Sequence, residues 1–171
     1  MSKRFVRKAC CLVLALGLTI PATAQDSASP AGNVLLTVTG VLSVTNTNDA
    51  LALDREMLMA LPMTTFSTST IWTEGEHSFT GVSLADFANA VGVDSGHFLA
   101  RAINDYTVEI PISDAVENGP IVAYLMDGAA IPVRDKGPLW VIYPYDINAD
   151  YRSEVIYTRS IWQLDRLEIV P

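Results

Sequence analysis

The residue types that most often carry catalysis are sparse in this sequence. His77 and His97 are the only histidines and belong to different segments, so a site with several histidine ligands is excluded. Serines are plentiful, but none lies in a Gly-x-Ser-x-Gly turn, and neither a Gly-x-Gly-x-x-Gly motif nor a phosphate-binding loop occurs. Glu74 and Glu76 flank a glycine, which is typical of a solvated turn. The sequence offers no catalytic constellation.

A set of aromatic, amide and charged residues predicts a binding site instead. A flat heteroaromatic ligand needs a stacking ring and a carboxylate or amide that faces its donor and acceptor atoms. Asn104 and Asp105 interrupt two apolar segments with a compact polar group, and Arg134 lies in a loop bounded by Gly and Pro. The candidate ligand-binding residues are Trp72, Asn104, Asp105, Tyr106, Arg134, Lys136, Tyr143 and Trp162.

The same residues also have structural interpretations. Residues 104–106 fit an Asx turn that closes a hairpin, and large rings such as tryptophan usually pack in a core. Trp72 follows a Thr/Ser-rich segment and precedes a Glu-Gly-Glu turn, which predicts that it lies at a pocket mouth. Trp162 has apolar neighbours, which predict burial. Spacing alone leaves open whether these residues converge.

One central strand is predicted to position these residues. Leu139 to Tyr143 is an apolar run that follows the charged turn Arg134-Asp135-Lys136 and Gly137-Pro138, and Pro144 ends it. This pattern indicates a buried strand with a polar mouth at its start. Loops on such a scaffold are where ligands usually bind.

The rest of the chain alternates irregularly between strand and helix patterns. Alternating apolar residues predict a strand over 34–44 that bends at Gly40. Asp54 is placed to cap a helix over 55–61, and Ser83 with Asp86 to open a helix over 84–91 that Gly92 ends. Residues 152–164 fit a helix or an extended segment. Further strands are predicted at 66–73, 98–103, 107–112, 120–126, 129–133, 139–143 and 167–170. The fold class is therefore α+β, with a mixed β-sheet and a few short helices.

The N-terminus resembles a secretory signal. Residues 1–24 combine a basic start, an apolar run and Ala22-Thr23-Ala24 before Gln25. A membrane anchor is the alternative, but the apolar run falls short of the roughly 20 residues that span a bilayer. We therefore expect a signal peptide at 1–24, a flexible leader at 25–33 and a single domain at 34–171, exported to the periplasm with no membrane insertion after cleavage.

Removal of the signal would change both cysteine content and charge. Cys10 and Cys11 are the only cysteines, so the mature chain would hold no disulfide and no thiolate metal ligand. The formal charge would fall from −8 to −12, because four of the eleven basic residues and none of the acidic ones precede Gln25. Such an acidic surface argues against nucleic acid and anionic lipid partners.

An ordered set of short motifs resembles the molybdopterin-binding domain of sulfite-oxidase-type oxidoreductases. The resemblance covers about residues 34–170 and implies an α+β mixed-sheet fold. The motifs are Trp72-Thr73-Glu74-Gly75, Phe79-Thr80-Gly81-Val82-Ser83-Leu84, Asn104-Asp105-Tyr106, Ile110-Pro111, Asp127-Gly128, Arg134, Lys136-Gly137-Pro138, Tyr143-Pro144 and Arg159-Ser160-Ile161-Trp162.

Departures from the family pattern shape the functional expectation. Catalytic members ligate molybdenum through a cysteine in the segment that corresponds to 67–73, and this chain has none there. The basic phosphate clasp of the family is also reduced, with Arg159-Ser160-Ile161-Trp162 in its place. The chain is similar to small exported pterin-binding proteins that signal to a membrane-bound sensor. We expect a non-catalytic protein that binds a reduced pterin and no metal; a molybdenum-cofactor oxidoreductase or its accessory subunit, and a structural module with a filled pocket, are the alternatives.

Overall fold

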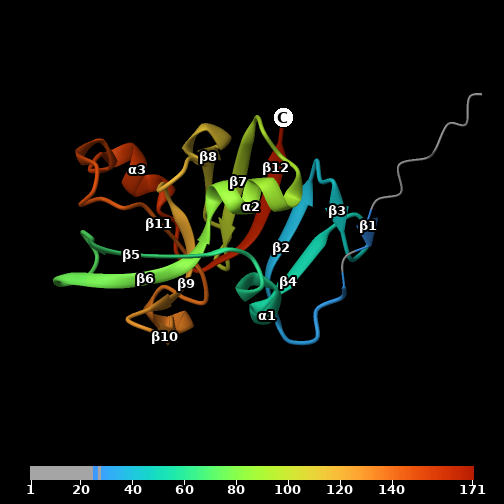
Figure 1. The fold of residues 1–171 in the computed structure, drawn as a ribbon, viewed down its shortest axis with the longest axis horizontal. Helices are drawn as coiled ribbons and strands as arrows, with labels where there is room; N and C mark the ends of the chain where they lie inside the picture. Colours follow the sequence, from blue (N-terminus) through green and yellow to red (C-terminus); the bar gives the residue numbers. More distant parts are fainter. Residues whose placement is uncertain (1–24, 27) are drawn as a thin grey trace, which may run out of the picture.

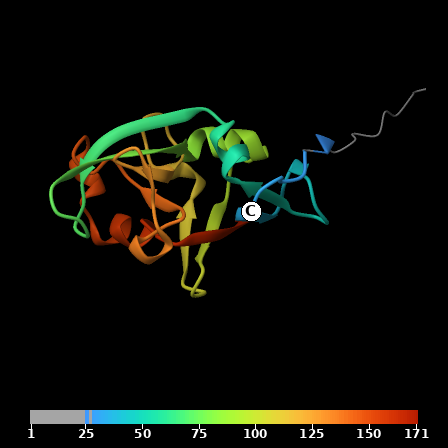
Figure 2. The ribbon, with the colours of Figure 1, turned by 90° about the horizontal axis from the view of Figure 1, so that it is seen from below.

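Two β-sheets with short helices at their edges form the part of the chain that the computed structural model describes, residues 25–26 and 28–171 (Figures 1 and 2). The predicted signal peptide at 1–24 lies outside these residues. Within them, no helix is long and apolar enough to cross a membrane.

The first sheet is antiparallel throughout. Its strands follow the order β10 (Ala129–Ala130), β9 (Ile121–Met126), β6 (Glu76–Ser83) and β5 (Met63–Ser69), and β11 (Trp140–Ile142) also pairs with β9. Strands β5 and β6 form a long hairpin whose tip extends to the same end of the molecule as α3 (Glu154–Arg159) in both views (Figures 1 and 2). This places residues that follow β5 beside residues from the C-terminal third of the chain.

The second sheet is mixed. Its order is β4 (Leu51–Asp54), β2 (Val34–Gly40), β12 (Leu164–Val170), β7 (His97–Ala102) and β8 (Thr107–Pro111). Strand β12 is parallel to β2, whereas the other neighbours are antiparallel. The predicted α+β class with a mixed sheet is therefore confirmed. A separate two-stranded pairing joins Gln25–Asp26 (β1), which belongs to the segment predicted as a flexible leader, to Val44–Thr45 (β3).

Helices α1 (Arg55–Met59) and α2 (Leu84–Val91) begin after the capping residues that the sequence predicts, and α1 ends two residues before the predicted Leu61. In α1, the Asp54 carboxylate accepts a hydrogen bond from Met57 N at 2.9 Å. In α2, Ser83 Oγ accepts from Asp86 N at 2.9 Å, and Gly92 ends the helix with φ of +75°. Short 3₁₀ turns occur at Ile112–Asp114 (η1), Val133–Asp135 (η2) and Ala149–Tyr151 (η3).

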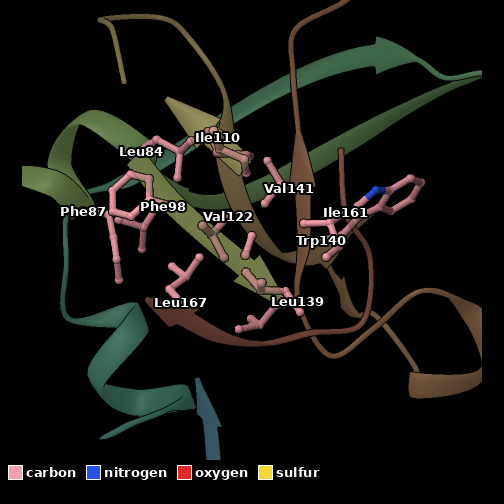
Figure 3. Packing of buried hydrophobic residues seen from close by; sticks show 14 of the residues in the cluster. Leu84, Phe87, Phe98, Ile110, Val122, Leu139, Trp140, Val141, Ile161 and Leu167 are labelled. Atoms are coloured by element: carbon pink, nitrogen blue, oxygen red, sulfur yellow. The ribbon is translucent and has the colours of Figure 1, made fainter. Parts of the chain in front are cut away.

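The predicted central strand lies in the core. Every residue from Leu139 to Tyr143 has no exposed surface, in agreement with the apolar run of the sequence. Phe87 and Phe98 pack at one end of the core cluster, and Trp140 lies at the other end (Figure 3). A side chain at Gly137 would collide with the backbone of Ile131, so only glycine fits at the start of this strand.

Candidate functional site

One pocket of about 690 Å³, hereafter the aromatic pocket, lies at the end of the molecule that holds α3 and the tip of the β5–β6 hairpin. Three parts of the chain build it: the turn after β5, the β7–β8 hairpin, and α3 with the residues that follow it. Its lining residues are Ile71, Trp72, Ala102, Asn104, Tyr106, Glu154, Tyr157, Thr158, Ser160, Ile161 and Trp162.

Trp72 is the centre of the aromatic wall. Its ring lies 5.7 Å from those of Tyr157 and Trp162 and 5.8 Å from that of Trp140, all in edge-to-face arrangements. Tyr145 also contacts it, with ring centroids 6.3 Å apart. Edge-to-face pairs hold aromatic rings in fixed orientations. The pocket therefore presents a wall of rings that is supported from behind by buried aromatic residues.

The turn that carries Trp72 is held in place by two polar anchors. Thr70 Oγ1 accepts hydrogen bonds from the backbone N–H groups of Trp72 and Thr73 at 3.1 and 3.0 Å, which ends the strand at Ser69 rather than at the predicted Thr73. The Asp146 carboxylate accepts from Ser69 Oγ at 2.8 Å and from Arg152 at 2.7 Å. Hydrogen bonds from Ser69 lower the pKa of Asp146, so this anchor is charged at neutral pH.

Ser160 anchors the segment that follows α3. Its hydroxyl donates to the carbonyl of Ile156 at 2.7 Å and accepts from the Tyr145 hydroxyl at 2.6 Å. The Ser160 carbonyl accepts from the indole N–H of Trp140 at 3.1 Å. These buried bonds fix the chain on both sides of Ser160, and with it the rings of Tyr157 and Trp162.

A half-buried ion pair holds α3 from outside the pocket. The Arg159 guanidinium lies 3.0 Å from the Asp114 carboxylate, and the Tyr143 hydroxyl donates to the same carboxylate at 2.7 Å. Burial, with the nearby charge of Asp114, raises the pKa of Tyr143 far above its usual range, so the hydroxyl remains a donor. Arg159 is therefore committed to Asp114 rather than to the pocket.

The structure brings four of the eight predicted site residues together. Trp72, Asn104, Tyr106 and Trp162 all line the aromatic pocket. Asn104 Oδ1 also accepts a hydrogen bond from Tyr106 N at 3.2 Å, which is the Asx turn that the sequence suggested as an alternative. The predicted burial order of the two tryptophans is wrong: Trp162 is 39% exposed, whereas Trp72 is half-buried among four rings, because the turn at Thr70 folds Trp72 inward.

The other four predicted residues lie outside the pocket lining. Asp105 is exposed and pairs with Arg166 at 2.9 Å, and Arg134 is exposed beside Asp135. The Lys136 ammonium lies 5.5 Å from the ring centre of Trp140. Tyr143 is fully buried, because its strand runs through the core.

Sequence reasoning missed seven of the eleven lining residues, and three of these, Glu154, Tyr157 and Thr158, lie on α3. The sequence left 152–164 open between helix and extended structure. Ser153 was the available signal, because Ser is a preferred residue immediately before a helix and its hydroxyl accepts from Ile156 N. A helix places residues four apart on one face, which brings Glu154 and Thr158 to the same wall.

Comparison with known proteins agrees with this fold. The family described as "Oxidoreductase molybdopterin binding domain" matches residues 43–150. The chain belongs to this family. The sulfane dehydrogenase SoxCD from Paracoccus pantotrophus has a similar structure, with a TM-score of 0.56 and 17% sequence identity, over 78% of this chain and 37% of that one. The chain thus spans well under half of that protein, and identity this low shows the fold alone. No curated protein matches the chain.

Membership of the molybdopterin-binding family indicates a pterin-type cofactor, but the residues present do not fit its metal. The chain has no cysteine after Cys11, and residues 25–26 and 28–171 contain no cluster of three or more His, Cys, Asp or Glu side chains that could hold an ion. Within 67–73, the segment where the resemblance places the thiolate of catalytic relatives, the hydroxyls of Thr68 and Ser69 bond to Asp146. Lys and Arg are absent from the described residues that line the aromatic pocket, so nothing there neutralises a phosphate.

Proposed function

We propose that this protein binds a reduced pterin, or a related bicyclic heteroaromatic compound, without a metal and without catalysing a reaction on it. The observation that carries the proposal is the aromatic pocket, whose rings come from Trp72, Tyr106, Tyr157 and Trp162 and whose lining contains a single charged side chain, Glu154. Apolar pockets with few polar groups at fixed positions are typical of sites for small organic ligands. The pterin class follows from the family.

We also propose a cellular location and a signalling role for the protein. The signal-like sequence at residues 1–24 supports export to the periplasm, and the absence of a thiolate and of a phosphate clasp supports a binding role rather than a catalytic one. A protein that binds a ligand reversibly in the periplasm can report its level, so we propose that it passes this signal to the periplasmic domain of a membrane-bound sensor.

The ligand is tested by calorimetric titration of the purified mature chain with 6-methyltetrahydropterin under anaerobic conditions. One binding site per chain is expected. The variant Met63→Ala should bind the pterin as the wild type does, because Met63 is 65% exposed on β5 outside the pocket lining. Absence of heat with pterins, in a protein that melts cooperatively, would show that the pocket serves another ligand or none.

The location and the partner need separate tests. Cell fractionation followed by N-terminal sequencing should find the chain in the periplasm, beginning at Gln25. Crosslinking in intact cells, with and without pterin synthesis, should capture a protein that has a transmembrane segment and a periplasmic domain, in an amount that depends on pterin. Capture that is independent of pterin would contradict the signalling role.

The second candidate function is a molybdenum-cofactor oxidoreductase or its accessory subunit. Family membership favours it, because the family is named for that cofactor. The missing thiolate and the lack of cationic side chains in the pocket lining oppose it. Elemental analysis separates the two: the binding protein should contain no stoichiometric molybdenum, whereas the oxidoreductase should.

A further inference from the structure

The polar side chains that line the aromatic pocket differ in whether they already have hydrogen-bond partners within the protein. Apart from its aromatic residues, the lining holds four polar side chains, those of Asn104, Glu154, Thr158 and Ser160. Thr158 donates its hydroxyl to the Glu154 carbonyl at 2.9 Å, and Ser160 is bonded on both sides. Asn104 uses its oxygen to close the hairpin turn. Within residues 25–26 and 28–171, the Glu154 carboxylate has no hydrogen-bond or ion-pair partner.

Three other carboxylates near this end of the molecule are already paired. Asp114 accepts from Tyr143 and Arg159, Asp146 from Ser69 and Arg152, and Asp105 from Arg166. None of these three lines the aromatic pocket. A ligand in the pocket that carries N–H donors therefore meets one carboxylate that is open to it, at Glu154.

Glu154 is also placed where two cavities meet. A second pocket of about 610 Å³ lies between β8 and α3, and it shares Tyr106, Glu154 and Thr158 with the aromatic pocket. A ring held against the tryptophans in the first pocket would have one edge at this shared wall. Glu154 therefore lies at the boundary of the aromatic pocket, where it can contact the edge of a bound ring.

We infer that Glu154 determines specificity by accepting two hydrogen bonds from the edge of the ligand ring, and that the pocket therefore selects rings with two adjacent N–H donors. This inference rests on the proposed function. An ionised carboxylate only accepts hydrogen bonds, and its two oxygens match two neighbouring donors. The 2-amino group and the N3–H of a pterin are such a pair. Lumazine has the same bicyclic ring but a carbonyl oxygen at position 2. This oxygen is an acceptor with a partial negative charge, so the carboxylate would repel it.

The test compares pterin with lumazine, which have the same bicyclic ring and similar size. Calorimetry on the purified mature chain should show pterin bound at least about tenfold more tightly than lumazine, because loss of a hydrogen bond to a charged group leaves a polar atom unmatched. In Glu154→Gln the preference should vanish or reverse in favour of lumazine, since the amide pairs with both the N3–H and the carbonyl oxygen of lumazine but with only one of the two donors of pterin. Glu117→Gln, an exposed acidic residue outside both pockets, is the matched control and should keep the wild-type preference.

The outcomes separate this inference from the proposed function. If the wild type binds neither of these rings nor 6-methyltetrahydropterin, the proposed function fails. If pterin and lumazine bind the wild type equally, or if the preference persists in Glu154→Gln, then Glu154 does not read the ring edge and the inference is overturned, although the pterin site stands. Glu154 is exposed, so the substitution should leave the melting temperature unchanged and the comparison valid.

Discussion

Truncation of the two pocket tryptophans gives the clearest separation between ligand binding and folding. Trp162 is 39% exposed and makes one ring contact, with Trp72, whereas Trp72 contacts four rings. A fully covered Trp side chain buries roughly 200 Å², so truncating the partly exposed Trp162 removes about 100 Å² of buried area. At roughly 25 cal/mol per Å² this is about 2.5 kcal/mol, which is an upper bound because unfolded chains already bury some surface.

We therefore predict that Trp162→Ala lowers the free energy of unfolding by about 1 to 2 kcal/mol and the melting temperature by about 2 to 8 °C. Trp72→Ala should cost more, about 3 kcal/mol, at the lower end of the range for buried tryptophans, because its ring is half-buried but packs against four others. Both variants lose a stacking surface, so ligand affinity should fall by about 2 kcal/mol, or roughly 30-fold.

The assay pairs thermal melting with calorimetric titration of the reduced pterin. Trp162→Ala is the decisive variant, because its affinity should fall as much as that of Trp72→Ala while its stability falls less. If Trp162→Ala binds with wild-type affinity while its melting temperature falls as much as that of Trp72→Ala, then Trp162 is a packing residue. The assignment of the aromatic pocket as the ligand site would then be refuted.

Three other predictions follow from individual contacts. Asp105→Asn should leave affinity unchanged and lower stability by no more than about 1 kcal/mol, since it weakens only exposed ion pairs with Arg166 and Arg101; a loss of affinity measured by calorimetry would show that Asp105 contacts the ligand. Asp114→Asn should destabilise the protein by about 2 kcal/mol and weaken binding, because Arg159 and Tyr143 lose the carboxylate that holds α3; unaltered chemical denaturation would contradict this. The hydrogen bond to Asp127 raises the pKa of His77 and the same bond lowers that of Asp127, so the pair stabilises the fold at pH values between the two and its contribution is lost as pH rises through the pKa of His77. His77→Asn should therefore melt below the wild type at about pH 5 and match it at about pH 9; a deficit that does not change with pH would disprove the coupling.

Strands and helices with strong local signals could be predicted from the sequence. The central run from Leu139 to Tyr143 and the two capped helices after Asp54 and Ser83 all form where expected. Strand β6 was missed, because its start is polar and Gly81 lowers its strand propensity. The structure explains that glycine, since a side chain there would collide with the backbone of β9. Strand β4 was missed because its four residues are all buried and show no alternation.

The candidate site could be predicted only in part, because its charged residues give no local signal of their role. The residue type of Trp72 and Asn104 is enough to predict them as ligand contacts. The sequence does not show, however, which charged side chains already form ion pairs within the protein. Asp105, Arg134 and Glu154 differ in their partners rather than in their sequence context. The partner of Asp105, Arg166, is 61 residues away in the chain, so only the folded structure shows that, among the residues it describes, Asp105 is paired and the Glu154 carboxylate is not.

Native mass spectrometry of the protein purified from its own cell envelope would identify the bound ligand and any metal together. We expect the mass of a chain beginning at Gln25 plus one pterin, without molybdenum and without a phosphate. A mass that corresponds to the same chain with a molybdenum-bearing, phosphorylated pterin would contradict this expectation.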